Sequence, residues 1–463
     1  MALPKKKLYI RTFGCQMNVA DSELMAQVLA DDFVLTDLAE EADLYLINTC
    51  AIRRKSEEKV RSLLGSLRKL KRRRPQLILG VGGCVAQQEG ERLLAAVPHL
   101  DLVFGTQGIY RLPEMVRRAG SGEKPFHLAL DQGFPAVKRR WTQAPAQALV
   151  TIMQGCDNYC SFCVVPYVRG REMSREPREI LEEVAAFLAG GGREVTLLGQ
   201  NVNSYGRGLA EPVTFTDLLR RVAGFPGLAR LRFATSHPRD LSRDLMGAFA
   251  ELPALCEHLH LPVQAGANRI LQAMNRGYTR EEYLKKVALL RRHCPDIALS
   301  TDLIVGFPGE TDADFAQTLD LMREVGFDQS YSFKYSPRPQ TRAAGFPDQV
   351  PEEVKAERLA HLQSLQDELT MKVHRRLVGQ VREVLVEGWS RRGEEQLCGR
   401  LRTNQVVNFS GPSALSGRLV RLRITEAHPH SLKGSLVGAS AVTQQHQAAC
   451  LSTCPEEVSC LEK

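Results

Sequence analysis

The sequence predicts a three-part α/β protein, with a doubly wound parallel-sheet domain, a partial (β/α)6 barrel and a small C-terminal β-barrel. Strand and helix candidates alternate through residues 5–120 and again through 148–374, which is the pattern of parallel sheets covered by helices. Short strand candidates without helices between them follow in residues 375–440, which is typical of a small barrel. A chain of 463 residues is long enough for two to three domains.

Four strand candidates define the N-terminal domain. They are KKLYIRTFGC, DLYLINTC, LILGVGGC and the short DLVFG. The helix DSELMAQVLADD, which opens with acidic residues, follows the first strand, and a charged helix from about Arg53 to Arg74 follows the second. Repeated βα units of this size predict a doubly wound sheet. Residues 121–147 are rich in Pro, Gly and polar residues and are interpreted as a linker.

Six strand candidates alternate with helices in the central segment. They are LVTIMQ, EVTLLGQ, RLRFATS, HLHLPVQ, ALSTDLIVG and SYSFKYS. Six βα units predict an arc of barrel with a wider mouth than the closed eight-stranded form. Barrel active sites lie at the carboxyl ends of the strands, and the loop QGCDNYCSFC follows the first of these strands directly.

The last segment changes to short β runs, namely VREVLVEG, CGRLRTNQVVNFSG, RLVRLRITEA and GSLVGAS. These runs predict a small antiparallel barrel. Residues 381–440 hold nine Lys and Arg against five Asp and Glu, so the module carries a net charge of +4. Residues 441–463 show no periodicity, and we expect a disordered tail.

Composition excludes several classes of protein. Hydrophobic content of 43% and charged content of 25% are typical of a globular protein, and no stretch approaches the ~20 apolar residues of a membrane span. The N-terminus has no apolar core of a signal peptide, so we expect a cytoplasmic protein without membrane contact. Twelve cysteines in such a chain favour metal binding over disulfides. The net charge of +8 is a weak indication of a polyanionic partner.

The most specific motif is the spacing C-x3-C-x2-C of Cys156, Cys160 and Cys163, which we call the central triad. Three thiolates on one loop can bind three of the four irons of a 4Fe–4S cluster, since cysteine thiolate is the usual ligand, and they leave one iron open. Zinc sites usually pair two short arms, and no second arm is present. The alternative is three unrelated buried cysteines.

A second set, Cys15, Cys50 and Cys84, ends the first three strand candidates, and we call it the N-terminal triad. In an open α/β sheet the ligand crevice lies beyond the carboxyl ends of the strands, so these residues are expected to converge. Glycines precede Cys15 and Cys84, and Asn-Thr precedes Cys50, which suits loops lying close to a cofactor. Here too one iron of a 4Fe–4S cluster stays open. The alternative is buried strand-end cysteines.

The remaining cysteines are less informative. Cys256, Cys294 and Cys398 lie in helix-end or strand contexts and are interpreted as packing residues. The tail cysteines receive no role, and they are Cys450, Cys454 and Cys460.

With two triads, a partial barrel and a basic β module, residues 5–440 resemble the methylthiotransferases of the radical S-adenosylmethionine (SAM) superfamily. The resemblance is closest to the subgroup that modifies an adenosine of tRNA. The segments that carry it are GCQMNVADSE, NTCAIR, GCVAQQEG, CDNYCSFCVVPYVRGREMSR, LLGQNVNSYG, FATSHPRDL, DLIVGFPGET and FKYSPRPQTRAA. Residues 261–267 depart from the subgroup, because LPVQAGA stands where LPVQSGS is usual.

The resemblance implies methylthiolation of C-2 of N(6)-dimethylallyladenosine at position 37 of tRNA, next to the anticodon. The central cluster would bind SAM and release a 5′-deoxyadenosyl radical, which abstracts hydrogen from C-2. The N-terminal cluster would carry the sulfur, methylated by a second SAM. It implies no catalytic residues beyond the cluster ligands, and it implies a low-potential electron donor and a monomer.

The resemblance also assigns cofactor contacts at the barrel mouth. Phe162 is the aromatic residue before the last cysteine of the central triad, and the Val305–Gly309 backbone would face the adenine of SAM. The full set of implied cofactor residues is Phe162, Gly199, Gln200, Asn201, Ser236, Gln264, Val305, Gly306 and Gly309. For each of these, ordinary strand-end packing remains the alternative.

RNA contacts are expected on the basic β module, which resembles a TRAM domain, a small RNA-binding barrel. Arg400, Arg402 and Asn404, with Phe409, would combine charge with stacking on an unpaired base of the anticodon stem-loop. The run RKLKRRR at residues 68–74 is either a second RNA contact or a solvated helix end favoured by the helix dipole.

Three rival functions stay open. Two belong to the same family, namely methylthiolation of threonylcarbamoyl-adenosine in tRNA and of an aspartate on a ribosomal protein. The third is an iron–sulfur RNA-binding protein without catalysis. Formation of 5′-deoxyadenosine from SAM separates the enzymes from the last of these.

Overall fold

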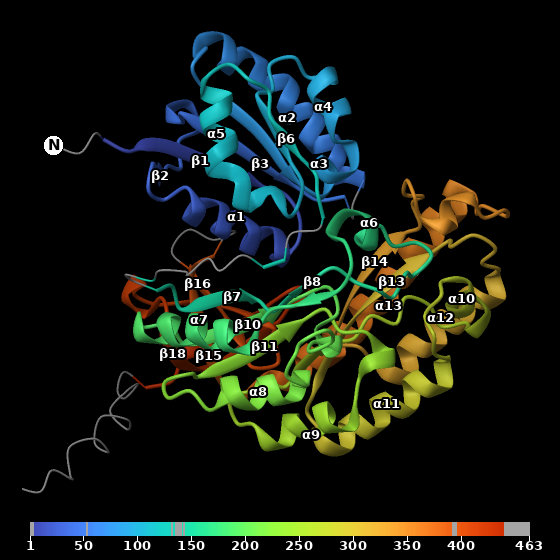
Figure 1. Ribbon diagram of the computed structural model, residues 1–463. Coiled ribbons are helices and arrows are strands. Elements are labelled where there is room, and N and C mark those ends of the chain that lie inside the picture. The colour runs from blue at the N-terminus through green and yellow to red at the C-terminus, as the bar shows by residue number, and fades with distance from the viewer. Residues whose placement is uncertain are drawn as a thin grey trace, which may run out of the picture. The chain divides into compact units, whose positions relative to one another are not determined.

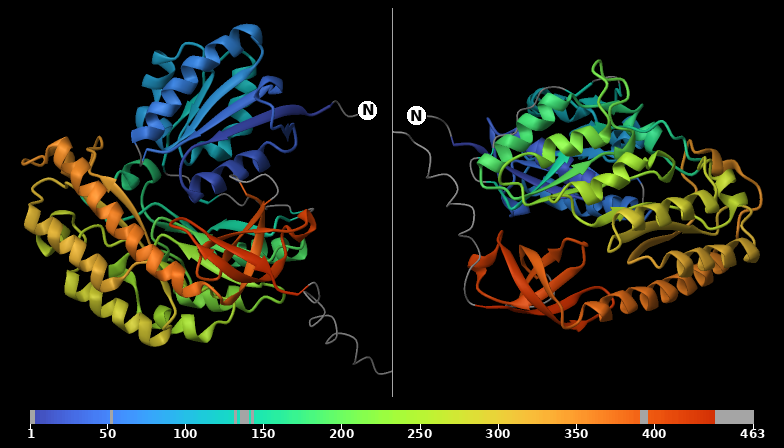
Figure 2. Two further views of the ribbon diagram at one scale, coloured as in Figure 1. Left: turned by 180° about the vertical axis from the view of Figure 1, so that it is seen from behind. Right: turned by 90° about the horizontal axis from the view of Figure 1, so that it is seen from below.

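A computed structural model describes residues 4–51, 54–130, 133–134, 141, 144–390 and 396–438 of the chain. It divides into two compact units, Met1–Thr370 and Met371–Lys463. The first unit contains the N-terminal and central domains, and the second contains the β module (Figures 1 and 2). Ile52 and Arg53 of the NTCAIR segment, much of the predicted linker and the predicted tail with its three cysteines lie outside the described residues.

The N-terminal domain is a parallel sheet of six described strands in the order β2-β1-β3-β4-β5-β6 (Figure 1). Their bounds are β1 Lys6–Thr12, β2 Phe33–Leu35, β3 Leu44–Thr49, β4 Ile78–Gly83, β5 Leu102–Phe104 and β6 Phe126–His127. The four predicted strands are confirmed as β1, β3, β4 and β5. Strands β2 and β6 were not predicted, and β6 lies in the segment interpreted as a linker.

Helices cover both faces of this sheet, which is the doubly wound arrangement that the sequence predicts. The helices are α1 Gln16–Val28, α2 Arg54–Arg73, α3 Cys84–Glu89, α4 Glu91–Ala96 and α5 Leu112–Gly120. Apolar side chains of α1 and α5 pack with one face in a core that includes Met25 and Met115. Those of α2 and α4 pack with the other face, in a core that includes Leu64 and Leu93.

The central domain contains all six predicted strands as two three-stranded parallel sheets, β11-β10-β7 and β12-β13-β14. Their bounds are β7 Gln147–Thr151, β10 Glu194–Leu198, β11 Arg230–Ala234, β12 His258–His260, β13 Ala298–Val305 and β14 Gln329–Lys334. A parallel bridge between Leu231 and Leu255 joins the two sheets into one arc. The predicted first strand is interrupted, because its end forms β8, Met153–Gln154, which pairs with β9, Met173–Ser174.

Helices follow the strands and pack their apolar faces onto the arc in one large core. They are α7 Pro177–Ala189, α8 Phe215–Ala223, α9 Arg243–Glu251, α10 Asn268–Ala273, α11 Arg280–His293 and α12 Asp312–Val325, and α13 Glu352–Leu377 leads out. The short helix α6 Val165–Arg169 packs instead in a separate cluster with Cys84 and Val85. Three of these helices begin at capping boxes, in which a threonine and the acidic residue three positions later satisfy each other's backbone N–H groups. These threonines are Thr214, Thr279 and Thr311.

The β module of the second unit is a closed barrel in the order β15-β16-β17-β19-β18 (Figure 2). Its strands are β15 Val381–Trp389, β16 Gln396–Leu401, β17 Val406–Ser410, β18 Leu419–Ala427 and β19 Leu432–Leu436. The predicted small barrel is confirmed, with one difference. Strands β17 and β19 pair in parallel, whereas the other pairs are antiparallel. Among the described residues, no helix is both long enough and apolar enough to cross a membrane.

Two cysteine triads as the candidate active site

The central triad lies on the loop between β8 and α6. Gly155, just before Cys156, has a φ of +77°, and a Cβ there would overlap the carbonyl oxygen of Arg171, so only glycine fits without strain. The Gly155 amide donates to Oε1 of Gln200 at 2.5 Å, and the Cys163 amide donates to the Cys160 carbonyl at 2.9 Å. The backbone of the loop is therefore fixed at both ends.

The middle of this loop is tied to the turn after α10. The Ser161 amide donates to the Met274 carbonyl at 3.0 Å, and its Oγ donates to the Ala273 carbonyl at 2.8 Å. Nδ2 of Asn275 donates to the Tyr159 carbonyl at 3.0 Å. The loop after the first strand thus depends on the second half of the barrel for its shape.

Charge at the central triad comes from a buried arginine. Nη1 of Arg276 donates to Sγ of Cys160 at 3.2 Å, and Nη2 donates to the Pro262 carbonyl at 2.6 Å. Burial raises the pKa of Cys156 to about 11. Burial, followed by the nearby charge of Cys160, raises the pKa of Cys163 to about 12. These thiols are protonated near neutral pH in the metal-free chain, so metal binding there must release protons.

The N-terminal triad follows three neighbouring strands. Cys15 comes after β1 and precedes α1, Cys50 comes after β3, and Cys84 comes after β4 and opens α3. The strand order runs outward in one direction from β1 to β2 and in the opposite direction from β3 to β6. Ligands of such sheets bind at the carboxyl ends of the two strands where the order switches, here β1 and β3. Gly14, at a φ of +133°, packs so closely that a Cβ would lie 2.8 Å from Cβ of Cys50. The fold therefore gathers the three predicted ligands at one edge.

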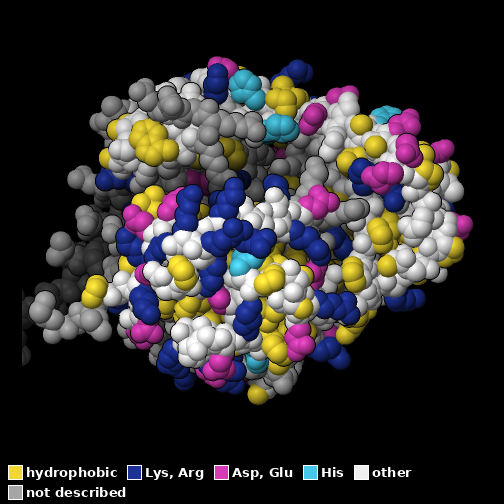
Figure 3. All heavy atoms as spheres, turned by 90° about the horizontal axis from the view of Figure 1, so that it is seen from above, with side chains coloured by type: hydrophobic (Ala, Val, Ile, Leu, Met, Phe, Trp, Pro, Cys, Tyr) yellow, Lys and Arg dark blue, Asp and Glu magenta, His cyan; other side chains and the backbone are white. Residues whose placement is uncertain are grey.

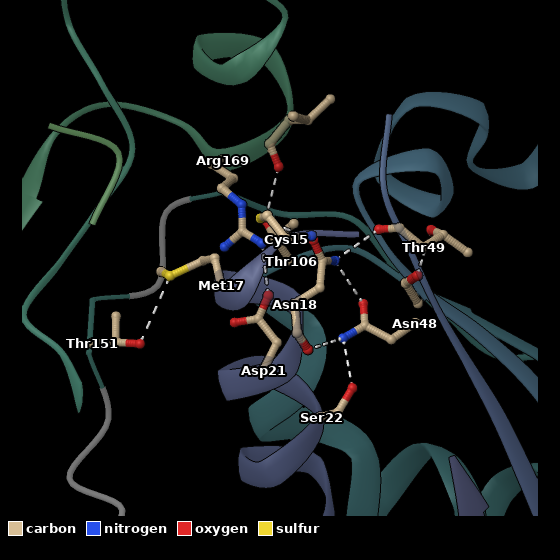
Figure 4. Close-up of polar contacts among 12 residues, drawn as sticks. Cys15, Met17, Asn18, Asp21, Ser22, Asn48, Thr49, Thr106, Thr151 and Arg169 are labelled. Carbon is tan, nitrogen blue, oxygen red and sulfur yellow. Dashed lines mark hydrogen bonds and ion pairs between the residues drawn. The ribbon is translucent and has the colours of Figure 1, made fainter. Parts of the chain in front are cut away.

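A buried polar network holds the strand ends below this triad (Figure 4). Nδ2 of Asn18 donates to Oδ1 of Asn48 at 3.1 Å and to the Thr49 carbonyl at 3.0 Å. Nδ2 of Asn48 donates to Oγ of Ser22 at 2.9 Å, and Oγ1 of Thr49 donates to the Gly82 carbonyl at 2.6 Å. Asn18 was not singled out from the sequence. A buried amide on a helix that follows a cysteine was the available signal.

The donor chemistry of both triads fits a cluster better than a single ion. Within the described part of the chain, no group of three or more His, Cys, Asp or Glu residues is arranged around one metal position. Each cysteine of a 4Fe–4S cluster binds a different iron. The cysteine sulfurs around a cluster therefore lie farther from one another than the sulfurs that bind a single metal ion. Each triad supplies three soft sulfur donors, as a cluster with one open iron requires, and glycines precede Cys15, Cys84 and Cys156. The described cysteines outside the triads, Cys256, Cys294 and Cys398, are buried, buried and half-buried.

The residues implied for SAM lie mostly at the carboxyl ends of the central strands. Gly199, Gln200 and Asn201 follow β10, Ser236 follows β11, Gln264 lies after β12, and Val305 and Gly306 lie at the end of β13. Phe162 lies in the triad loop, half-buried against the core. Gly309 is farther along the loop after β13, where its carbonyl accepts from Nη2 of Arg269 at 2.7 Å.

Among the residues implied for SAM, two buried polar atoms have no hydrogen-bond partner within the described part of the chain. They are Oδ1 of Asn201, whose Nδ2 donates to Asp240 at 2.7 Å, and Oγ of Ser236. Buried polar groups without partners are uncommon in folded proteins. These two atoms fit a mouth that binds a polar ligand, as the resemblance implies for SAM.

His237, next to Ser236, gives a pH-dependent prediction. Its Nδ1 accepts from the Arg239 amide at 3.2 Å, and burial, followed by the charge of Arg276, lowers its pKa to about 2. Between the folded pKa of about 2 and the unfolded pKa near 6.5, the unfolded chain binds more protons at this histidine than the folded chain does. The free energy of unfolding is therefore highest above pH 6.5 and decreases as the pH falls. We expect the metal-free wild type to lose up to about 1.4 kcal/mol per pH unit below pH 6.5 relative to His237→Asn.

Thermal unfolding of both metal-free proteins from pH 7.5 to 5.0 measures this difference. Asparagine keeps an acceptor near the position of Nδ1 but does not titrate. Parallel Tm curves for the two proteins would contradict a neutral, buried His237.

The predicted RNA residues of the β module separate into two groups. Arg400 is half-buried on β16 and its Nε pairs with Glu387 at 2.8 Å. Arg402 and Asn404 lie half-buried in the turn after β16, with a φ of +75° at Asn404. Phe409 is only 2% exposed and belongs to the barrel core. The predicted stacking role of Phe409 is therefore wrong, because β17 turns this ring inward with Val407.

The basic end of α2 is partly committed to the N-terminal domain itself. Lys71 pairs with Asp101 at 2.6 Å and Arg74 pairs with Asp43 at 3.1 Å. The exposed cations of this stretch are Arg68, Lys69, Arg72 and Arg73. Figure 3, which views the chain from the side of the N-terminal domain, shows Lys and Arg side chains gathered on this face. Both interpretations of residues 68–74 remain predictions.

Comparison with family models matches three segments. Residues 7–105 match the uncharacterized protein family UPF0004, residues 150–322 match the radical SAM superfamily, and residues 375–437 match the TRAM domain. Among solved structures, a radical S-adenosylmethionine methyltransferase, TsrM, from Kitasatospora setae is similar with a TM-score of 0.56 and 15% identity. That alignment covers 73% of this chain and 75% of that one, and it supports the fold alone.

Curated relatives are far more similar in sequence. A tRNA-2-methylthio-N(6)-dimethylallyladenosine synthase from Geobacter metallireducens is 54% identical, covering 93% of this chain and 98% of that protein. Proteins of the same name from Syntrophobacter fumaroxidans and Moorella thermoacetica are 52% and 48% identical. The first alignment covers 93% of this chain and 95% of the Syntrophobacter protein. The second covers 94% of this chain and 100% of the Moorella protein.

Proposed function

Because this chain belongs to the tRNA-2-methylthio-N(6)-dimethylallyladenosine synthase family of radical SAM enzymes, we propose that it methylthiolates tRNA. The atom modified is C-2 of N(6)-dimethylallyladenosine at position 37, next to the anticodon. The single observation that carries the proposal is the presence of two three-cysteine sites in one compact unit. Two sites, each with an open iron, match a reaction that needs both a radical source and a sulfur donor.

The central triad, Cys156, Cys160 and Cys163, holds the 4Fe–4S cluster that binds SAM in this proposal, and the N-terminal triad holds the auxiliary cluster. When bound, the clusters supply a low-potential electron for cleavage of SAM and the sulfur that is transferred. Asn201 and Ser236 orient SAM with their unpartnered oxygens. Gln200 keeps the loop of the central triad in place through the Gly155 amide.

The remaining partners follow from the same chemistry. A low-potential electron donor must reduce the central cluster, and we propose that the enzyme acts as a monomer on the anticodon stem-loop of tRNA. The buried Arg276 beside Cys160 contributes a fixed positive charge, which raises the reduction potential of a nearby cluster relative to an uncharged site.

Mass spectrometry of tRNA nucleosides from a strain lacking the gene tests the function. We expect the 2-methylthio form of N(6)-dimethylallyladenosine to disappear, the unmodified precursor to accumulate, and the wild-type gene to restore the product. Loss of a methylthiolated threonylcarbamoyl-adenosine, or of a methylthiolated ribosomal aspartate, would instead identify one of the rival substrates. Purified protein that forms no 5′-deoxyadenosine with dithionite and SAM would favour the non-catalytic alternative.

The β module gives a prediction about tRNA affinity. Changing Arg400 and Arg402 together to Ala should weaken tRNA binding, because it removes two cations that would contact phosphates. Each lost phosphate contact should also reduce the magnitude of the slope of log affinity against log salt concentration by about 0.7 to 0.9. Glu387→Ala is the matched control, since it removes the carboxylate that neutralises Arg400 and should strengthen binding. Binding titrations at several salt concentrations measure both effects. An unchanged slope in the double variant would move RNA recognition away from β16.

A further inference from the structure

Helix α6 connects the two triads. It begins two residues after Cys163 and packs against the start of α3, where Cys84 lies, in an apolar cluster of Ala51, Cys84, Val85, Val164 and Val168. Oγ1 of Thr106, from the N-terminal domain, donates to the Val168 carbonyl at 2.8 Å. The helix that leaves the central triad is thus held against the N-terminal triad.

Arg169, the last residue of α6, extends from the central domain into the N-terminal domain. Its Nη2 donates to Oδ2 of Asp21 at 2.7 Å, and Arg169 is 3% exposed. Its Nη1 is buried and has no hydrogen-bond partner among the residues that the structure describes. Figure 4 shows the guanidinium beside Cys15 and Asp21. Nη2 of Arg169 is therefore held by Asp21, while the N–H groups of Nη1 remain available to donate a hydrogen bond at the N-terminal triad.

The electrostatics of the site agree with this geometry. Arginine side chains stay protonated in proteins, so the buried guanidinium of Arg169 carries a positive charge beside Cys15. The guanidinium stays charged, and it is close enough to favour negative charge on the sulfur ligands. A buried cation needs a compensating anion, which Asp21 supplies, and each buried N–H donor needs an acceptor, which Nη1 lacks among the described residues.

We propose that Arg169 is a positioning residue for the auxiliary cluster, which it contacts by donating from Nη1 to sulfur at the N-terminal triad. The inference rests on the proposed function, because it requires that the N-terminal triad holds a cluster. Hydrogen bonds and net charge at the sulfurs set the reduction potential of iron–sulfur clusters. Arg169 stabilises the more negative, reduced form and raises the potential, and Asp21 holds the guanidinium in place while lowering it.

A redox titration followed by electron paramagnetic resonance tests the inference. The background is the full chain with Cys156, Cys160 and Cys163 changed to Ala, so that the N-terminal triad holds the one remaining cluster. In this background, Arg169→Gln should make reduction at least tenfold less favourable, a shift of about −59 mV for one electron. Arg169→Lys, which keeps the charge, should shift the potential less, and Asp21→Asn should shift it upward.

The opposite signs expected for Arg169→Gln and Asp21→Asn separate an electrostatic role from a structural one, because loss of a domain contact would act alike in both variants. Arg171→Gln is the matched control, since Arg171 is an exposed arginine two residues later that pairs with Asp157. The reduction potential of the cluster in this variant should equal that of the background protein. An unchanged potential in Arg169→Gln, or shifts of the same sign in both variants, would overturn the inference. A background protein that binds no iron would instead overturn the assignment of the N-terminal triad and the proposed function with it.

Discussion

Changing Cys156, Cys160 and Cys163 together to Ala is expected to abolish cleavage of SAM and to halve the iron content, from about eight to about four atoms per reconstituted chain. Cleavage is lost because the proposed electron source and the open iron that binds SAM are both at the central triad. The remaining four irons stay at the N-terminal triad, whose ligands follow strands of a different sheet.

Iron and sulfide analysis, with 5′-deoxyadenosine quantified after addition of dithionite and SAM, measures both effects. Cys294→Ala is the matched control, because Cys294 is a buried cysteine of the same domain outside the triads. It should keep both the iron and the cleavage. A triple variant that retains eight irons would show that the central cysteines are not cluster ligands.

Changing Cys50 to Ala is expected to separate radical formation from sulfur transfer. Cys50 is 2% exposed at the switch point of the N-terminal sheet, so its loss removes one of three ligands there without touching the loop of the central triad. The variant should still convert SAM to 5′-deoxyadenosine. It should place no methylthio group on tRNA.

The measurement is a single incubation with tRNA in which 5′-deoxyadenosine and modified nucleosides are both quantified. Cys256→Ala, at a position that is 1% exposed in the central domain, controls for the loss of a buried thiol. Wild-type methylthiolation by Cys50→Ala would refute the assignment of the sulfur donor to the N-terminal triad.

Strands with strong apolar patterns could be predicted from the sequence, and short edge strands could not. The six central strands are confirmed, and β10 and β13 among them are buried apolar runs. Strand β2 has three residues, two of them exposed, and β6 has two residues. Neither length carries a periodicity that could distinguish a strand from a loop.

The site divides in the same way, between what local spacing shows and what only the folded chain brings together. The cysteines could be found because their spacing and their places at strand ends are local features. The pair of Asp21 and Arg169 could not, since 148 residues separate its members and Asp21 was interpreted as part of a helix opening. Phe409 was predictable as a core residue, because alternate residues of β17 face inward, as Val407 does.

The order of strands in the N-terminal domain separates the crevice from the ligand that occupies it. Sheets with the strand order 2-1-3-4-5 bind flavin and other small molecules in the crevice at the carboxyl ends of their first and third strands. Here the first two of the three cysteines follow these two strands. The crevice is a property of the winding and not of the ligand. A sheet of this order can therefore accept a different ligand when the residues at three strand ends differ, while the strands themselves stay the same.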